Sequence, residues 1–258
     1  MVTTAHGAGP AAKAEGLRLA ARLDAVFVPR DGRSIEDLLA EHGAAGALVV
    51  GAQRVTLFFG KEQFFFHPGT AALRIKSLLA GKPDQMIRAM DLHPGDEVLD
   101  CTLGLGADAV VASFVAGPRG RVVGVERVAA VAAVVEHGLR HHAVKSDPRL
   151  EEALRRIEVV TADHLDYLRG APAESFDVVY FDPFFRTPLH GAYQIQPLRA
   201  LGNRMPLSKE AVVEALRVAR RRVVVKERRG SAEFARLGFK RISGGRYARV
   251  AYGVIEVK

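Results

Sequence analysis

The segment Asp100-Cys-Thr-Leu-Gly104-Leu-Gly106-Ala-Asp108-Ala109 decides the fold of this chain. It follows the apolar run Val98–Cys101, which is typical of a strand buried on both faces, and it leads into a predicted helix, Asp108–Val115. Its glycines let the backbone approach a ligand closely, and the start of the helix offers N–H groups that no helical carbonyl binds. The segment is therefore predicted to be a ligand-binding loop between a strand and a helix.

Strands and helices alternate from this loop to the C-terminus. Further strands are predicted at Arg121–Glu126, Ile157–Val160, Asp177–Phe181 and Arg222–Val225, and helices at Ala129–His141, His164–Leu168, Lys209–Arg220 and Ala232–Leu237. The strands Phe239–Ser243 and Arg246–Val257 flank Gly244-Gly245, which indicates an antiparallel hairpin. The predicted fold class is α/β, a Rossmann-like and mostly parallel sheet with an antiparallel C-terminal hairpin.

The first third of the chain has a different pattern. Two helices, Leu17–Asp24 and Ile35–His42, precede three short β-prone runs, Ala47–Val50, Val55–Phe59 and Phe64–Phe66. We expect a small N-terminal α+β unit over residues 16–68 and a larger domain over residues 69–258, which begins with helices at Ala71–Leu79 and Asp84–Met90. Residues 1–15 are rich in Gly, Ala and Thr and are predicted to form a disordered tail.

Composition restricts the class of protein. Hydrophobic residues make up 48% of the 258, and the single cysteine, Cys101, excludes an internal disulfide and a cysteine-based zinc site. The sequence lacks an apolar run long enough to span a bilayer and a signal-peptide core, so a cytoplasmic location is expected. The net charge of +8 is concentrated in Arg217–Arg249, which holds 12 basic and 2 acidic residues. This asymmetry favours a polyanionic partner such as RNA, with a solvated surface as the alternative.

Acidic residues around the loop distinguish between cofactors. Glu126 ends the strand after the loop, where a carboxylate can accept hydrogen bonds from both ribose hydroxyls, and Asp163 and His164 end the third strand, where they can contact an adenine ring. NAD enzymes use the same glycine-rich loop and remain the alternative. Asp100 before the loop and Asp108 at the helix start would repel a pyrophosphate but attract a sulfonium. The predicted cofactor is therefore S-adenosylmethionine.

The motif Asp182-Pro183-Phe184-Phe185 closes the fourth strand, at the edge of the sheet where ligands bind. Asp182 and the carbonyl of Pro183 can accept the two N–H bonds of an exocyclic base amine and direct its lone pair at a methyl group. Phe185 can stack on the base. The alternative is a simple turn at the strand end with both phenylalanines in the core.

These motifs resemble the bacterial methyltransferases that modify the exocyclic amine of a guanine in small-subunit ribosomal RNA, and their Gram-positive relatives. The resemblance rests on Asp100-x-Thr-x-Gly-Leu-Gly-x-Asp-Ala, Glu126-Arg127, Val-Val-Tyr180-Phe-Asp182-Pro-Phe-Phe, Arg222-Val-Val-Val-Lys226 and Gly245-Arg-Tyr247. The run Phe66-His67-Pro68-Gly69-Thr70-Ala-Ala-Leu-Arg74-Ile-Lys76 resembles the Gram-positive relatives more specifically.

The resemblance implies a class I methyltransferase fold and a set of cofactor contacts. The contacts fall on Ala107, Asp108, Glu126, Arg127, Asp163, His164 and Asp182, in addition to Asp100, Gly104 and Gly106 of the loop. Ala107 stands where the ribosomal RNA enzymes have Arg, Asp163-His164 replaces a Ser-Ser pair, Phe184 replaces Met, and Arg186 stands where Pro is expected. These departures leave the RNA target open.

Candidate substrate contacts lie after the fourth and fifth strands. Lys226 resembles a lysine of the family and is a candidate to hold a substrate phosphate, with a solvated lysine as the alternative; Arg186, Arg228 and Arg229 are further candidates. Arg74 is predicted to be an ordinary charge on a helix surface, with a lid or RNA contact beside the site as the alternative.

The sequence thus predicts an S-adenosylmethionine-dependent N-methyltransferase that acts on a guanine amine in ribosomal RNA and requires no metal. A methyltransferase of a small molecule or a protein, and an inactive RNA-binding assembly factor, are the alternatives.

Overall fold

The structure is a computed structural model that describes residues 1–144, 147–183, 206–245 and 247–257. The described residues divide into two compact units. Met1–His67 and Val128–Ala143 belong to the first unit, and the other described residues belong to the second.

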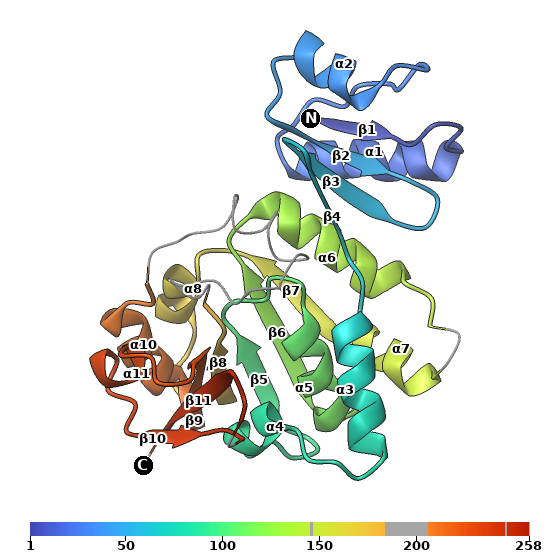
Figure 1. The fold of residues 1–258 in the computed structure, drawn as a ribbon. Helices are drawn as coiled ribbons and strands as arrows, with labels where there is room; N and C mark the ends of the chain where they lie inside the picture. Colours follow the sequence, from blue (N-terminus) through green and yellow to red (C-terminus); the bar gives the residue numbers. More distant parts are fainter. Residues whose placement is uncertain (145–146, 184–205, 246, 258) are drawn as a thin grey trace. The chain divides into compact units, whose positions relative to one another are not determined.

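The first unit contains a four-stranded sheet in the order β1-β2-β3-β4 (Figure 1). β1 is parallel to β2, and the other neighbours are antiparallel. The strands are β1 (Val2–Thr4), β2 (Gly46–Val50), β3 (Val55–Phe59) and β4 (Glu62–Phe65), and the helices are α1 (Pro10–Arg22), α2 (Ile35–Glu41) and α6 (Ala129–His141). α1 packs on β1 and β2, and α6 packs on β3.

The prediction of a disordered tail over residues 1–15 was wrong. Val2 is fully buried in β1; its N–H donates to the carbonyl of Val26, and its carbonyl accepts from the N–H of Val28, each at 2.8 Å. Pro10 is the first residue of α1, a position where its fixed φ suits a helix and its missing N–H costs nothing. A strand of three residues is too short to show a recognisable pattern in the sequence. Its pairing partners also lie far along the chain, so no local signal indicates it.

The second unit is built on a seven-stranded sheet in the order β10-β11-β9-β8-β5-β6-β7 (Figure 1). The strands are β5 (Glu97–Asp100), β6 (Arg121–Glu126), β7 (Ile157–Thr161), β8 (Phe176–Phe181), β9 (Ala219–Arg228), β10 (Arg241–Ser243) and β11 (Val250–Glu256). β5 to β9 are parallel, and β11 lies antiparallel between β9 and β10. This confirms the predicted Rossmann-like sheet with its antiparallel hairpin.

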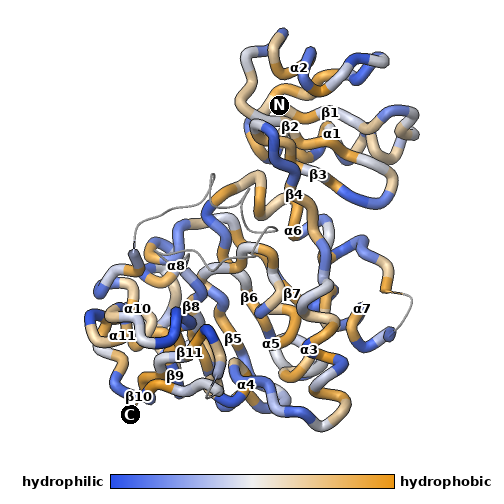
Figure 2. The backbone as a smooth tube through the Cα atoms, in the orientation of Figure 1, coloured by the Kyte–Doolittle hydropathy of each residue, from blue (hydrophilic) through white to orange (hydrophobic). Residues whose placement is uncertain are grey.

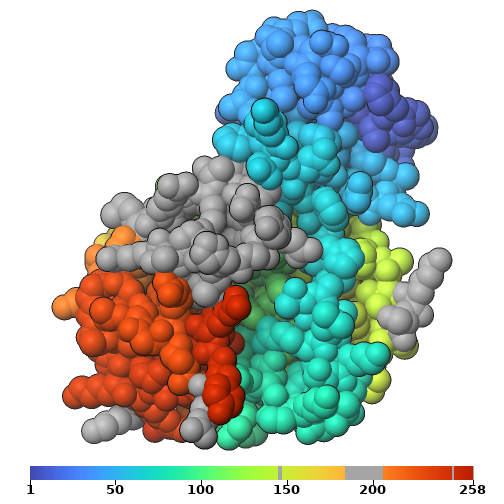
Figure 3. Space-filling view, viewed as in Figure 1, coloured from blue at the N-terminus to red at the C-terminus, as the bar shows by residue number. Residues whose placement is uncertain are grey.

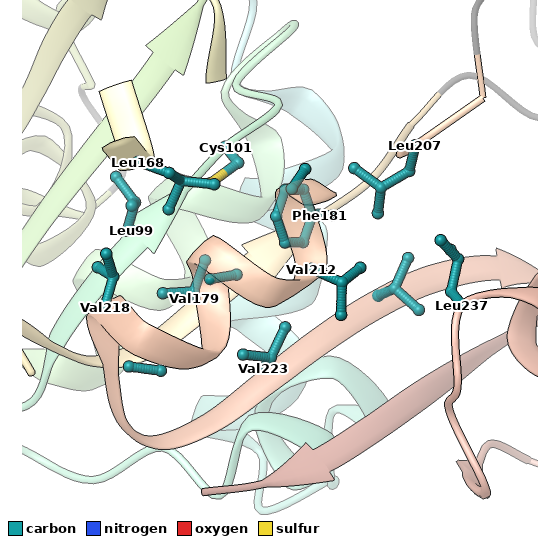
Figure 4. Packing of buried hydrophobic residues seen from close by; sticks show 14 of the residues in the cluster. Leu99, Cys101, Leu168, Val179, Phe181, Leu207, Val212, Val218, Val223 and Leu237 are labelled. Atoms are coloured by element: carbon teal, nitrogen blue, oxygen red, sulfur yellow. The ribbon is translucent and has the colours of Figure 1, made fainter. Parts of the chain in front are cut away.

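Helices cover both faces of this sheet. They are α3 (Gly69–Leu79), α4 (Gln85–Met90), α5 (Ala107–Ala116), α7 (Pro148–Arg155), α8 (His164–Gly170), α10 (Lys209–Val218) and α11 (Glu233–Arg236). α5 packs on β5 and β6 and is flanked by α3 and α7, whereas α10 packs on β8 and β9. Alternate strand residues such as Leu99, Val179 and Val223 share one cluster of buried hydrophobic side chains with residues of α10 such as Val212 and Val218 (Figure 4).

The apolar character of the central strands explains why they are buried on both faces. In Figure 2 the strands β5, β6 and β8 are largely hydrophobic, and Val98, Leu99, Val178 and Val179 are each at most 1% exposed. Chain order reverses at β5, which pairs with β6 on one side and β8 on the other. In such sheets the crevice for ligands lies beyond the carboxyl ends of these strands.

No helix in the described part of the chain is both long and apolar enough to cross a membrane.

Candidate functional site

The loop after β5 has the backbone that its glycines predict. Gly104 and Gly106 have φ angles of 49° and 75°, in the left-handed region that favours glycine, and Gly106 caps the N-terminus of α5. Glu126, at the end of β6, accepts a hydrogen bond from the Gly104 N–H at 3.1 Å between N and Oε2. The carboxylate predicted to bind ribose therefore also fixes the conformation of the loop.

Thr102 joins the ends of β5 and β8. Its N–H donates to Asp100 Oδ1 at 3.0 Å, and its hydroxyl oxygen accepts from the Asp182 N–H at 2.5 Å. Asp100 is 2% exposed. Burial, assisted by the charges of Asp108 and Asp182, raises the pKa of Asp100 to about 8. Asp100 is thus largely protonated at neutral pH when no cation faces it.

Asp108 lies in the first turn of α5 at the centre of a charged network. Its Oδ1 accepts from the Arg74 guanidinium, and its Oδ2 accepts from Lys226 Nζ at 2.9 Å and from the Tyr180 hydroxyl at 2.7 Å. Burial opposes the charge of Asp108, but Lys226 and Arg74 outweigh it and hold its pKa well below the ordinary value. These donors come from α3, β8 and β9, so Asp108 links three elements around the crevice.

Lys226 bridges two carboxylates. Its Nζ lies 2.7 Å from Asp182 Oδ2 in addition to its contact with Asp108. Burial opposes its charge, but the two carboxylates outweigh burial and hold the pKa of Lys226 above its ordinary value. The alternative that Lys226 is simply solvated is wrong, because its ammonium contacts both aspartates, whereas its contact with a substrate phosphate stays a prediction.

Arg74 was predicted to be an ordinary surface charge, and this was also wrong. Its side chain is 21% exposed, and it donates to Asp84 through Nε at 2.8 Å and Nη2 at 2.9 Å while it contacts Asp108. Asp84 in turn caps the N-terminus of α4 through the N–H groups of Met86 and Ile87. Arg74 therefore connects α3 and α4 to the network.

The third strand end carries a different arrangement. Asp163 caps α8, since its Oδ1 accepts from the Leu165 N–H at 2.9 Å. The His164 ring lies edge-on to Phe181 with 5.9 Å between ring centroids, and burial lowers its pKa. Arg127, after β6, is exposed. Asp163 and His164 remain candidates for contacts with an adenine ring.

Only part of the motif after β8 can be described. Asp182 and Pro183 are partly buried, whereas Phe184, Phe185 and Arg186 lie outside the described residues. Partial burial raises the pKa of Asp182 above its ordinary value, although the Lys226 ammonium opposes this rise.

A cleft of about 410 Å³ adjoins the network, with Arg74 and Asp84 shared between the two. Its other polar lining residues include Thr70, Ser77, Lys82 and Gln85. In Figure 3 the surface is hollowed between the residues of α3 and the C-terminal strands. The cleft is within the size range of ligand pockets in proteins.

The basic segment Arg217–Arg249 is more neutral in space than in sequence. Arg220 pairs with Glu97 and Asp177, Arg221 with Asp96, and Arg222 with Asp91 and Glu256. Arg229 donates to the carbonyls of Gly245 and Ala248, so it closes a turn. Among the described residues the structure gives no ion pair for Arg228, and Arg228 and Arg229 both stay predicted RNA contacts.

The comparison with known proteins decides the family. Residues 38–241 match the family described as "Putative SAM-dependent methyltransferase". The chain belongs to this family. This methyltransferase is 38% identical to YpiP from Bacillus subtilis over 99% of both chains. It is 34% identical to the ribosomal RNA small subunit methyltransferase J of Laribacter hongkongensis, over 62% of this chain and 57% of that protein.

Solved structures show the same fold. A SAM-dependent methyltransferase from Neisseria gonorrhoeae superposes on the methyltransferase with a TM-score of 0.68 at 17% sequence identity, over 99% of this chain and 95% of that one. The description of the matching family shows that the predicted cofactor, S-adenosylmethionine, is the cofactor of this family, and the named relatives confirm the predicted resemblance.

The residues around the crevice fit this cofactor. A buried carboxylate, Asp100, suits an ammonium group, Glu126 suits ribose hydroxyls, and the acid-rich surroundings suit a sulfonium. Asp108 stays a predicted cofactor contact, and in this structure its oxygens accept hydrogen bonds from Arg74, Tyr180 and Lys226. Within the described residues no group of His, Cys, Asp and Glu side chains could hold a metal ion.

Sequence reasoning did not identify Thr102 and Tyr180 as parts of the site, although both stand within the quoted motifs. The signal for Thr102 was its position between Asp100 and the glycines. Nothing in the sequence indicates that the Tyr180 hydroxyl reaches α5.

Proposed function

We propose that this methyltransferase transfers a methyl group from S-adenosylmethionine to the exocyclic amine of a guanine in ribosomal RNA. The observation that carries the proposal is the position of Asp182 and Pro183 at the carboxyl end of β8, joined through Thr102 to the buried Asp100 at the end of β5. This arrangement supports the proposal, because it joins the residue that we assign to the amine, Asp182, to the carboxylate predicted to bind the cofactor, Asp100.

The chemistry follows from what these residues accept. An exocyclic amine is a weak nucleophile because its lone pair is delocalised into the ring. Hydrogen bonds from its two N–H groups to the Asp182 carboxylate and the Pro183 carbonyl localise that lone pair and fix its direction. When bound, the cofactor would supply an electrophilic methyl group to this lone pair, and its sulfur would keep the electron pair of the broken carbon–sulfur bond. Asp182 accepts the surplus proton of the nitrogen and releases it to water.

RNA is the favoured substrate for two reasons. A relative that matches 62% of the chain is named as a ribosomal RNA methyltransferase, and a cleft of about 410 Å³, within the size range of ligand pockets, adjoins the network. The charge of the C-terminal segment gives weaker support than its sequence suggests, because several of its arginines are paired. The inactive assembly factor is disfavoured because Asp100, Glu126, Asp163 and Asp182 are all present.

The test is a comparison of modified nucleosides in ribosomal RNA from cells with and without the protein, measured by mass spectrometry. We expect one methylated guanosine to disappear without the protein, to return with the wild type and not with Asp182→Asn. The matched control, Asp31→Asn, makes the same chemical change at an exposed position and should restore the modification. An unchanged nucleoside profile, together with methyl transfer to a small molecule or protein fraction, would establish the alternative substrate class.

A further inference from the structure

We propose that Lys226 is a positioning residue that holds Asp182 as an ionised hydrogen-bond acceptor for the substrate amine, with Asp108 as the anchor that holds Lys226 in place. This inference rests on the proposed function, since it assigns the reason why Asp182 can accept the amine. It is distinct from the prediction that Lys226 binds a substrate phosphate.

The first step is the geometry of Lys226. Its side chain is 21% exposed, and its Nζ lies 2.7 Å from Asp182 Oδ2 and 2.9 Å from Asp108 Oδ2. Among the described residues it is the one cation in an ion pair with Asp182. Because Lys226 occupies Oδ2, the second oxygen of Asp182 is the one that we assign to the amine.

The second step is the rigidity of the anchor. Asp108 accepts from Arg74 and Tyr180 as well as from Lys226, and Arg74 is itself held by both oxygens of Asp84. A carboxylate with donors on three separate elements has little freedom to rotate. The ammonium of Lys226 is therefore fixed by a group that does not depend on the substrate.

The third step is charge balance. Burial and the charge of Asp108 both favour protonation of the Asp182 carboxyl group. A protonated Asp182 would present an O–H donor where the amine needs an acceptor. Lys226 opposes that protonation, and an opposite charge in contact typically lowers a carboxyl pKa by about 1–3. Loss of Lys226 should therefore convert Asp182 from an acceptor into an acid across neutral pH.

The experiment compares Lys226→Met, which keeps the length of the side chain without its charge, with Lys226→Arg, which keeps the charge. The matched control is Lys209→Met, the same change at an exposed position on α10. In the cofactor-free protein the Asp182 carboxyl is titrated by ¹³C NMR and assigned with Asp182→Asn. We expect its pKa to rise by about 1–3 in Lys226→Met and to change little in Lys226→Arg and in the control.

In the active enzyme, the acidic limb of the kcat profile should move to higher pH by the same amount in Lys226→Met, so that activity recovers as pH rises. The groups that surround Asp182 and Lys226 and share this titration are Asp100 on β5, Asp108 on α5, Arg74 on α3, Tyr180 on β8, Glu227 on β9 and Tyr252 on β11. A kcat that falls equally at every pH would indicate a merely structural role and overturn the proposal.

Failure of the role of Lys226 and failure of the proposed function give different results. An unchanged pKa of Asp182 in folded Lys226→Met refutes the role of Lys226 whatever the substrate is. Absence of RNA methylation by the wild type refutes the proposed function, but the titration of the cofactor-free protein still tests Lys226. If Lys226→Met does not fold, Lys226→Gln is titrated in its place, with the same expected rise.

Discussion

Asp100→Asn should make the stability of the cofactor-free protein less sensitive to pH. The substitution keeps Oδ1 as the acceptor for the Thr102 N–H, which it binds at 3.0 Å, and removes the carboxyl group whose pKa is raised to about 8 by burial. The ordinary value is 3.8, so the folded protein holds a proton that the unfolded chain releases between about pH 4 and pH 8. The wild type therefore loses stability as pH rises through this window, and the loss is complete above pH 8.

The magnitude follows from the two pKa values. At 1.36 kcal/mol for each unit, the difference sets an upper limit of ~6 kcal/mol for the loss across the window. Solvent relaxation around a buried carboxylate lowers such penalties, so we expect about 2–4 kcal/mol. The slope is the sharper quantity, because the free energy of unfolding of the variant minus that of the wild type should rise by up to ~1.4 kcal/mol per pH unit.

Urea denaturation of both proteins at several values between about pH 5 and pH 9 measures this slope. Equal m-values are required, because they show that both proteins expose the same surface on unfolding. A pH-independent loss of stability caused by the amide of the variant does not change the slope of the free-energy difference with pH. A difference in unfolding free energy that stays flat with pH would refute the raised pKa of Asp100 and the charge balance built on it.

The remaining predictions concern the ligands. Asp182→Asn should raise the barrier to methyl transfer by about 3–4 kcal/mol, comparable to the loss of one preorganised contact, with little change in a cofactor Kd measured by calorimetry; transfer at the wild-type rate would contradict the role of this residue. Glu126→Ala should weaken cofactor binding by about 1.5–3 kcal/mol, because it removes charge-assisted hydrogen bonds and frees the Gly104 N–H, and an unchanged Kd would exclude a ribose contact. Arg228→Ala should lower RNA affinity and reduce its salt slope by about 1, whereas Arg220→Ala, which breaks pairs with Glu97 and Asp177, should lower stability and leave that slope unchanged. Equal salt slopes for the two variants would mean that neither side chain meets phosphate.

Much of the fold could be predicted because its signals are local. The helix Ala129–His141 and the strand Arg121–Glu126 were predicted to the residue, since apolar runs bounded by glycine or by charged residues mark where each begins and ends. The helix α7 was missed, because eight residues give few turns of periodicity. The end of α10 was placed too late, because β9 begins at Ala219, where its partner strand and not local propensity decides the conformation.

The candidate site could be predicted only in part, for a related reason. The carboxylates at the strand ends were found because position in an α/β sheet determines which side chains face the crevice. The ion pairs of the cations were not predicted, because the role of each cation depends on a partner that is distant in the sequence. Arg74 meets Asp108 across 34 residues of chain, and Lys226 meets the same carboxylate across 118. A local count of charge likewise cannot show that Arg221 is neutralised by Asp96, which lies 125 residues away.

The balance of charge gives these pairings a functional meaning. Around the crevice, Asp84, Asp108 and Asp182 face Arg74 and Lys226, and Asp100 stays protonated until a cation approaches it. The protein side of the site therefore carries a net negative charge. A cationic cofactor neutralises this charge, whereas the demethylated product, which lacks the sulfonium charge, neutralises it less. This negative charge thus favours replacement of the spent product by a new molecule of the methyl donor. Lys226 keeps Asp182, the carboxylate that we assign to the substrate, from becoming protonated in these acidic surroundings.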